Sequence, residues 1–251
     1  MKLYVLTGAS RGLGRAIASQ LLAADVLLLT IERTPDATLR NEASAAGARL
    51  EQWALDVAHD VGVAARLEAW LHGQDGAHST GATLINNAGA LGSIGPVEAM
   101  PTDEIATVLR VGLEAPIALT SAFIRATAGW KAERRVLNIS SGAGRNPIGG
   151  WSTYCAAKAG LDHFTRVAAM DEARKPNGTK LVSLAPGVID TAMQSQLRSA
   201  DAAGFPDKQR FLDLHDKGQL ASPEEGARRV LAYLARPDFG RQPVADVRDN
   251  K

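Results

Sequence analysis

Residues 7–14 read TGASRGLG and directly follow a short apolar run at the N-terminus. Glycines at positions 8, 12 and 14 allow a tight turn, and residues 15–23 continue with the apolar face of a helix. A glycine-rich turn between a buried strand and a helix brings backbone N–H groups to the positive end of the helix, where they bind phosphate. The stretch therefore predicts a strand–loop–helix unit that receives the pyrophosphate of a dinucleotide.

Short apolar runs recur along the chain and alternate with longer amphipathic segments. Runs of this length separated by helices are typical of βαβ units and a parallel sheet. No repeat, low-complexity tract or linker interrupts the pattern. The sequence therefore predicts an α/β fold with a Rossmann-type doubly wound parallel sheet, as a single domain over residues 1–251. Its strands are expected at residues 3–7, 26–31, 50–55, 83–85, 135–139 and 180–184.

Composition excludes several functional classes. Of the 251 residues, 45% are hydrophobic and 22% charged, and the net charge is +1, so neither disorder nor a nucleic-acid partner is expected. The single cysteine, Cys155, excludes an internal disulfide, and the five histidines show no ligand spacing, so no metal is expected. No window approaches the roughly 18 to 20 apolar residues of a membrane span. We expect a soluble cytoplasmic protein.

The residues after the second predicted strand bear on the choice of dinucleotide. Glu32 stands where a carboxylate accepts hydrogen bonds from the ribose hydroxyls of NAD(H). Arg33 beside it and Arg11 within the glycine loop would instead suit the 2′-phosphate of NADP(H), which Glu32 would repel. On this balance NADP(H) is favoured over NAD(H). Alternatively, Glu32 points to solvent or pairs with one of the two arginines.

Several motifs follow one another in an order that resembles the short-chain dehydrogenase/reductase family. Besides the glycine loop they are LDV at 55–57, NNAG at 86–89, NISS at 138–141, and Tyr154 with Lys158. Pro186 and Gly187 complete the series, which spans nearly the whole chain. The resemblance implies that the following residues contact the cofactor: Gly8, Ser10, Arg11, Gly12, Leu13, Gly14, Glu32, Arg33, Asp56, Val57, Asn87, Ala88, Gly89, Tyr154, Lys158, Pro186, Gly187, Ile189 and Thr191.

In that family the residue at Asp56 binds the adenine amine, the residue at Asn87 lies along the cofactor, and residues 189–191 approach the nicotinamide. Each of these could instead be a turn residue that satisfies its own backbone.

Tyr154 and Lys158 are four residues apart and share one helix face, so the ammonium can lie near the phenol. A positive neighbour favours phenolate and lowers the tyrosine pKa. Ser141 lies 13 residues before Tyr154, which is the family's spacing for the serine that holds the substrate carbonyl. Ser140 is expected to point to the other side of the strand. The resemblance implies hydride transfer to a ketone that Ser141 holds and Tyr154 protonates, while Lys158 holds the ribose and lowers the tyrosine pKa.

Gly112 departs from the family pattern, which has a catalytic asparagine at this position. Pro116, four residues later, has no N–H and crowds the carbonyl at i−4, so we expect a kinked helix with a free Gly112 carbonyl. In the family this main-chain carbonyl holds a water linked to the lysine, and we expect that relay to persist. The missing side chain leaves a non-enzyme alternative, a catalytically weakened nucleotide-sensing protein.

Two segments bear on the substrate, GWSTYCAAK at 150–158 and APGVIDTAMQ at 185–194. They resemble sepiapterin reductases and bacterial benzil-type diketone reductases, which implies NADPH-dependent reduction of a small ketone or diketone. Trp151, Met193 and Asp246 are the candidate substrate residues, although Trp151 could serve packing and Asp246 could be merely solvated.

A flexible flap at about 193–220 is expected to cover the substrate, and its character suits an aromatic or heterocyclic carbonyl better than a charged acid. A 3-oxoacyl thioester or another alcohol–ketone pair is an alternative substrate. The small-residue-rich helices expected at 115–126 and 156–170 imply, by resemblance, a homodimer or homotetramer.

Overall fold

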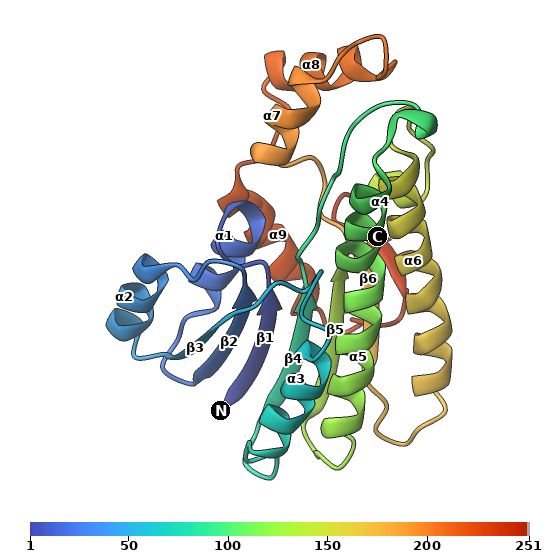
Figure 1. Ribbon diagram of the computed structural model, residues 1–251. Helices are drawn as coiled ribbons and strands as arrows, with labels where there is room; N and C mark the ends of the chain where they lie inside the picture. Colours follow the sequence, from blue (N-terminus) through green and yellow to red (C-terminus); the bar gives the residue numbers. More distant parts are fainter. Residues whose placement is uncertain (250–251) are drawn as a thin grey trace.

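A seven-stranded parallel sheet lies at the centre of the computed structural model, which describes residues 1–249 (Figure 1). The strand order is β3-β2-β1-β4-β5-β6-β7, so the chain builds outward from β1 in one direction and then from β4 in the other. This order confirms the doubly wound parallel sheet expected from the sequence. The strands are β1 (Lys2–Thr7), β2 (Val26–Glu32), β3 (Arg49–Ala54), β4 (Gly81–Asn86), β5 (Glu133–Ile139), β6 (Lys180–Ala185) and β7 (Val244–Asp246).

Six of the seven strands coincide with the apolar runs in the sequence to within two residues at either end. The whole of β2 is buried, as expected for a parallel strand covered by helices on both faces. The sequence prediction missed β7, because three residues after Pro243 give no periodic run. This strand pairs with β6, with Ala185 opposite Asp246.

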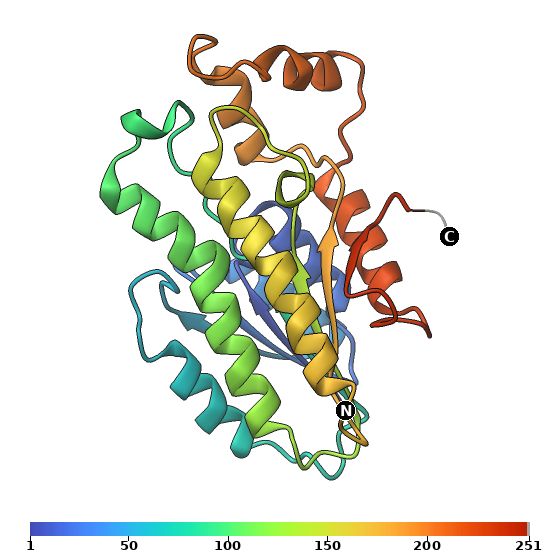
Figure 2. The same ribbon diagram turned by 90° about the vertical axis from the view of Figure 1, so that its right-hand side faces the viewer.

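Helices cover both faces of the sheet (Figures 1 and 2). One face packs under α1 and α9 around a core that includes Leu6 and Ile17, and the other packs under α3 and α5 around Leu67 and Phe123. The helices are α1 (Gly12–Leu21), α2 (Ala37–Ala46), α3 (Val63–His72), α4 (Thr102–Leu109), α5 (Ala115–Ala126), α6 (Ser152–Glu172), α7 (Ala192–Ser199), α8 (Lys208–Asp216) and α9 (Pro223–Leu234), with short turns η1 (Val97–Ala99), η2 (Arg110–Glu114) and η3 (Gly142–Gly144).

The helix between β4 and β5 differs from the expected kink at Pro116. The chain widens into the π turn η2, in which the N–H of Ala115 donates to the carbonyl of Arg110. Because proline cannot donate to the carbonyl four residues earlier, a wider turn ahead of it keeps the helix continuous.

This continuity also corrects the expectation of no membrane-length apolar stretch. By length and composition alone, the helix at residues 102–126 could cross a membrane, since its mean hydropathy is 1.4. Half of the stretch is buried inside the protein, and α5 packs against α3 and α6. A core helix of a globular protein shows the same combination of length, apolarity and burial.

Residues 190–220, here called the lid, leave the body after β6 and return before α9. Most of the lid is helical, since it contains α7 and α8, which rise above the carboxyl ends of the strands (Figures 1 and 2). Its two ends are held together by a parallel bridge between Ile189 and Ala221. The N–H of Asp190 donates to the Ala221 carbonyl at 2.9 Å, and that of Ala221 donates to the Val188 carbonyl at 3.0 Å.

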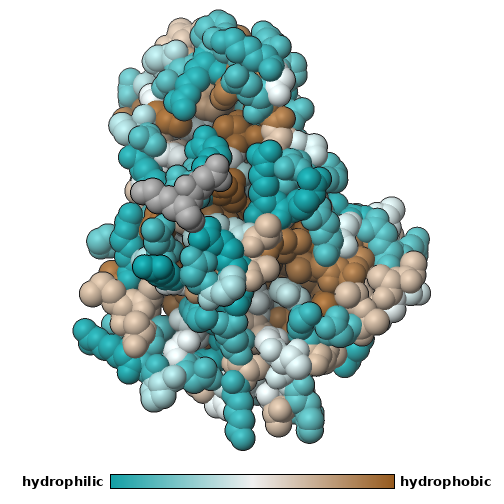
Figure 3. Space-filling model, turned by 180° about the vertical axis from the view of Figure 1, so that it is seen from behind, coloured by the Kyte–Doolittle hydropathy of each residue, from teal (hydrophilic) through white to brown (hydrophobic). Residues whose placement is uncertain are grey.

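The lid packs on the body through aromatic rings. Trp151, at the start of α6, stacks on Phe205 with 5.6 Å between ring centroids and lies 5.4 Å from the ring of Phe211. The edge of Tyr154 completes the cluster at 5.3 Å from Trp151. Seen from behind, apolar surface lines the recess between the lid and the body (Figure 3).

Candidate active site

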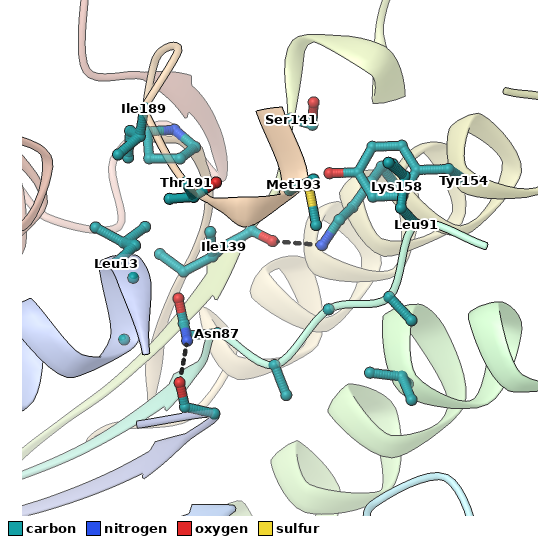
Figure 4. A pocket seen from close by; sticks show the side chains of 18 of the residues that line it. Leu13, Asn87, Leu91, Ile139, Ser141, Tyr154, Lys158, Ile189, Thr191 and Met193 are labelled. Carbon is teal, nitrogen blue, oxygen red and sulfur yellow. Dashed lines mark hydrogen bonds between the residues drawn. The ribbon is translucent and has the colours of Figure 1, made fainter. Parts of the chain in front are cut away.

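One cavity of about 690 Å³ opens at the carboxyl ends of the strands, beneath the lid (Figure 4). Its position between the loops that follow β1 and β4 is the topological switch point of the sheet, where doubly wound folds bind their ligands. All of the cofactor and catalytic residues that the sequence singled out line this cavity, as do Trp151 and Met193. Asp246 does not.

The loop between β1 and α1 has a geometry that only glycine permits. Gly8 and Gly12 have φ angles of +73° and +55°, in the left-handed region. A Cβ on Gly14 would lie 2.0 Å from the carbonyl oxygen of Gly8 and 2.3 Å from the side-chain nitrogen of Asn87. Glycine at these positions therefore lets the loop fold tightly around the start of α1, where backbone N–H groups bind phosphate.

Thr7 and Asn87 join the glycine loop to the segment after β4. The Thr7 hydroxyl accepts from the N–H groups of Asn87 and Ala88, both at 3.0 Å. In return, the Asn87 carboxamide donates to the carbonyls of Thr7 and Gly8 at 3.0 and 3.1 Å (Figure 4). Asn87 thus fixes the shape of the loop from the side. No pattern in the sequence had indicated the part played by Thr7.

Glu32 ends β2 with its carboxylate buried, and only 4% of the residue is exposed. Thr30 donates to one carboxylate oxygen at 2.9 Å, while the other has no partner among the described residues. Burial raises the pKa of this carboxyl to about 7. The alternatives of a solvated Glu32 or a pair with Arg11 or Arg33 do not hold, because the carboxylate is buried and forms no ion pair with either arginine within residues 1–249.

Asp56 lines the cavity after β3 and also satisfies its own turn. One of its carboxylate oxygens accepts from the N–H of Ala58 at 2.9 Å, and the other lies 3.4 Å from the ring of His59. The turn role considered as an alternative from the sequence is therefore real, and it leaves the carboxylate at the cavity wall.

Tyr154, Lys158 and Ser141 meet at the end of β5, as the sequence predicted (Figure 4). Tyr154 and Lys158 lie on one face of α6, with the ammonium 5.8 Å from the centre of the phenol ring. The Lys158 ammonium donates to the Ile139 carbonyl at 2.8 Å. The Ser141 hydroxyl accepts from the N–H of Ala143 at 3.2 Å and lies on the same side of the cavity as the Tyr154 phenol.

The electrostatics of this group differ from the expectation in one respect. Burial raises the pKa of Tyr154 to about 12, and the contribution that lowers it comes from Ser141, not from Lys158. Burial also lowers the pKa of Lys158 to about 8, while Asp162 opposes that change. Desolvation outweighs the attraction between the two groups, so without further positive charge the phenol stays protonated at neutral pH and is an acid.

Asp162, one turn beyond Lys158, anchors a buried network that the sequence analysis did not single out. The hydroxyls of Ser140 and Ser183 both donate to one of its carboxylate oxygens at 2.6 Å. Arg145 donates to the other at 3.1 Å and to the Ala245 carbonyl at 2.8 Å. Ser140 therefore points away from the cavity, as expected, and β5, β6, β7 and α6 are tied together. The only sequence signal for this network was that Asp162 lies four residues after Lys158, on the same face of the helix.

Gly112 is buried in the π turn, facing α6. A Cβ at this position would lie 3.1 Å from the Cβ of Ala157, which sits between Tyr154 and Lys158 on α6. The absence of a side chain therefore lets the helix approach α6 closely at the catalytic turn.

Asp246 forms a two-pronged ion pair with Arg248, at 2.8 and 2.6 Å. Arg248 lines the cavity and Asp246 lies beneath it. Of the two, Arg248 is therefore the residue at the cavity wall, while the candidate substrate residue Asp246 contacts its guanidinium.

The family model for short chain dehydrogenases matches residues 2–202. The chain belongs to the short-chain dehydrogenase/reductase family. It is 36% identical to a Bacillus cereus benzil reductase that forms (S)-benzoin, over 95% of this chain and 96% of that protein. It is 32% identical to the sepiapterin reductase of Xenopus tropicalis, over 92% and 90% of the two chains. A crystal structure of a short-chain dehydrogenase/reductase from Burkholderia vietnamiensis superposes with a TM-score of 0.66 at 34% sequence identity. The match covers 100% of this chain and 98% of that one.

Membership makes this protein a carbonyl reductase that acts on CH–OH and C=O groups with an NAD(P) cofactor. Two features of the cavity fit a dinucleotide. Glycine at position 14 lets the loop close on itself, with the Gly8 carbonyl and the Asn87 carboxamide where a Cβ would lie, at the start of α1 where a pyrophosphate binds. The unpartnered oxygen of Glu32 lies at the end of β2, where a ribose hydroxyl can donate to it.

Proposed function

We propose that this reductase reduces a small ketone or diketone of the benzil type, with an apolar body, and that it uses NADPH. The observation that carries the proposal is the apolar wall that the body and lid place around Tyr154. A cavity with such a wall and few polar groups suits an aromatic carbonyl compound. The wall consists of Leu91, Ile148, Trp151, Met193, Leu197, Phe211 and Leu214.

In the proposed reaction the bound cofactor supplies the hydride. The hydroxyls of Ser141 and Tyr154 hold the substrate oxygen, and Tyr154 gives it a proton, which a phenol with a pKa of about 12 can donate at neutral pH. Lys158, fixed by the Ile139 carbonyl, holds positive charge beside the phenol as the proton leaves. The lid excludes water from the carbonyl.

The cofactor preference rests on the charges at the end of β2. Arg11 and Arg33 line the cavity, and neither forms an ion pair within residues 1–249. Glu32 would repel a 2′-phosphate only when ionised, and its pKa of about 7 leaves much of it neutral at physiological pH. We therefore infer that NADP(H) is preferred.

The affinity for NADPH should rise relative to that for NADH as the pH falls through 7, because Glu32 becomes neutral. The measurement is the ratio of the two dissociation constants between pH 6 and 8.5. In the Glu32→Gln variant residue 32 cannot ionise. The pH dependence that remains in this variant therefore comes from ionisation of the 2′-phosphate of NADPH. An identical pH dependence in both proteins would exclude a role for Glu32 in this choice.

The test of the function is NADPH oxidation with benzil, other diketones, sepiapterin and 3-oxoacyl thioesters. We expect turnover of benzil, and a loss of about 10³-fold or more in kcat for Tyr154→Phe because the proton donor is gone. Cofactor binding without turnover of any of these compounds would favour the nucleotide-sensing alternative. A preference for thioesters would replace the diketone as the substrate class.

We also propose self-association through α5 and α6. On the outer side of α6, Val167 and Met170 are 47% and 64% exposed, which is unusual for large apolar side chains. Light scattering of the wild type and of Met170→Lys tests this, and a monomeric wild type would contradict it.

A further inference from the structure

The charged residues that line the cavity are unevenly distributed. On the cofactor side the acidic residues are Glu32, at the end of β2, and Asp56, after β3, and they are accompanied by Arg11 and Arg33. On the other side of the catalytic Tyr154, the cavity wall carries Arg210 and Arg248 and no acidic residue within the described chain. Charges of both signs therefore lie on the cofactor side, whereas the substrate side carries only cations among the described lining residues.

Arg248 enters this wall directly after β7. The N–H of Val247 donates to the Ala185 carbonyl at 3.0 Å, which places the segment beside the end of β6. Val247 also lies 3.7 Å from the position of a Cβ on Gly187. On the neighbouring side, Arg145 ties the segment that begins at Ser141 to the Ala245 carbonyl. Arg248 thus stands between the two loops that border the substrate position.

The guanidinium of Arg248 is held along one edge. Its Nε and one terminal nitrogen donate to Asp246, whose side chain is only 10% exposed, and the pair fixes the orientation of the group. The Arg248 side chain itself is 59% exposed. A guanidinium has five N–H donors, so the remaining nitrogen is left with hydrogens for a ligand.

Arg210 belongs to α8 and reaches the same cavity from the lid. Its side chain is exposed, and its guanidinium forms no hydrogen bond or ion pair with any residue from 1 to 249. Closure of the lid on a substrate would bring this unpaired cation to the cavity beside Arg248. A negative group there would satisfy both arginines.

We infer that the substrate carries a carboxylate in addition to its ketone, and that Arg248 is the residue that selects it. This inference rests on the proposed function and deepens it, since the apolar wall receives the body of the molecule and Arg248 receives the acid. The buried Asp246 is then a positioning residue, because it orients the guanidinium without contacting the ligand. Both carboxylate oxygens of Asp246 already accept hydrogen bonds from Arg248, so Asp246 is not available to a ligand with several donors along one edge, such as a pterin.

The test compares aryl oxo acids with their own methyl esters. Benzoylformate, 3-benzoylpropionate and 4-benzoylbutyrate place the carboxylate at increasing distances from the ketone, and each ester has the same skeleton without the charge. We expect kcat/KM to favour the acid by about tenfold in at least one pair, as for a charge-assisted hydrogen bond at a half-exposed site. The ratio should fall as salt is added.

The Arg248→Ala variant should bring that acid-to-ester ratio close to one, and Arg248→Lys should retain part of it. Arg229→Ala, which removes an exposed ion-paired arginine on α9 outside the cavity, is the matched control and should leave the ratio unchanged. No acid preference in the wild type, or an equal loss for acids and esters in Arg248→Ala, would overturn the inference.

Failure of the proposed function is distinguishable from failure of this inference. If the wild type reduces none of these ketones, the proposed function fails. Calorimetric titration of the enzyme–NADPH complex with the same acids and esters then still measures the selection of the carboxylate. Acid binding that Arg248→Ala abolishes would support the role of Arg248, and equal binding of acid and ester would refute it.

Discussion

Replacing Lys158 by methionine should change how the stability of the cofactor-free protein depends on pH. Burial lowers the pKa of Lys158 from its ordinary value of 10.5 to about 8. The folded protein therefore holds this proton more weakly than the unfolded chain does. Below pH 8 both states are protonated and the fold carries the whole cost of the buried charge. As the pH rises from 8 to 10.5 the folded state loses the proton first, and this cost disappears.

The size of the effect follows from the pKa difference. A shift from 10.5 to about 8 corresponds to about 3 kcal/mol of free energy of unfolding at pH 7. Methionine removes that cost but leaves the Ile139 carbonyl without its donor, which costs about 1 to 3 kcal/mol at every pH. The absolute stability at pH 7 therefore changes little or rises. Relative to the variant, the wild type should gain about 2 kcal/mol between pH 7 and pH 9.5.

Urea unfolding of both proteins at the two pH values measures this gain. Lys131→Met, at an exposed position, is the control and should follow the wild type. Stability curves of Lys158→Met and wild type that run parallel across this range would refute a pKa lowered by burial. Lys158→Met should also lose most of its reductase activity. The buried ammonium of Lys158 therefore serves catalysis while it lowers the stability of the folded protein.

Two other substitutions test the packing behind the catalytic residues. Gly112→Ala should destabilise the protein by about 1 to 2 kcal/mol, because its Cβ would meet that of Ala157 at 3.1 Å; adding Ala157→Gly should recover much of the loss in a thermal unfolding cycle, and strict additivity would contradict this. Asp162→Asn should cost about 3 kcal/mol in urea unfolding, because it breaks the buried pair with Arg145, and a change below 1 kcal/mol would show that the network contributes little.

Local sequence patterns predicted the parts of the structure that depend on local physics. The apolar runs identified six strands, and the glycine loop and the four-residue spacing of Tyr154 and Lys158 predicted geometry that the fold confirms. The Ser-x-x-Glu spacing at 222–225 is typical of a capping box, and Ser222 indeed caps α9 by accepting from the N–H of Glu225. The two acidic residues after Thr102 likewise favour a cap at that threonine, but Thr102 is the first residue of α4.

Features that depend on distant contacts could not be predicted in this way. The pairing of Asp162 with Arg145 and the placement of Arg248 at the cavity require β5, β6 and β7 to be assembled first. The pKa of Tyr154 depends on how deeply the lid buries it, which the spacing to Lys158 does not reveal. The π turn before Pro116 replaced a kink because neighbouring helices favour a continuous core helix.

The bridge between Ile189 and Ala221 has a consequence for how this enzyme can change over evolution. Because the two ends of the lid are fastened to each other, the intervening segment is a closed excursion whose length hardly alters the cost of forming it. Insertions, deletions or wholesale replacement there would leave the dinucleotide machinery undisturbed. The lid can thus be replaced without changing the rest of the fold, so one reductase scaffold can acquire new substrate specificities while its catalytic chemistry stays constant.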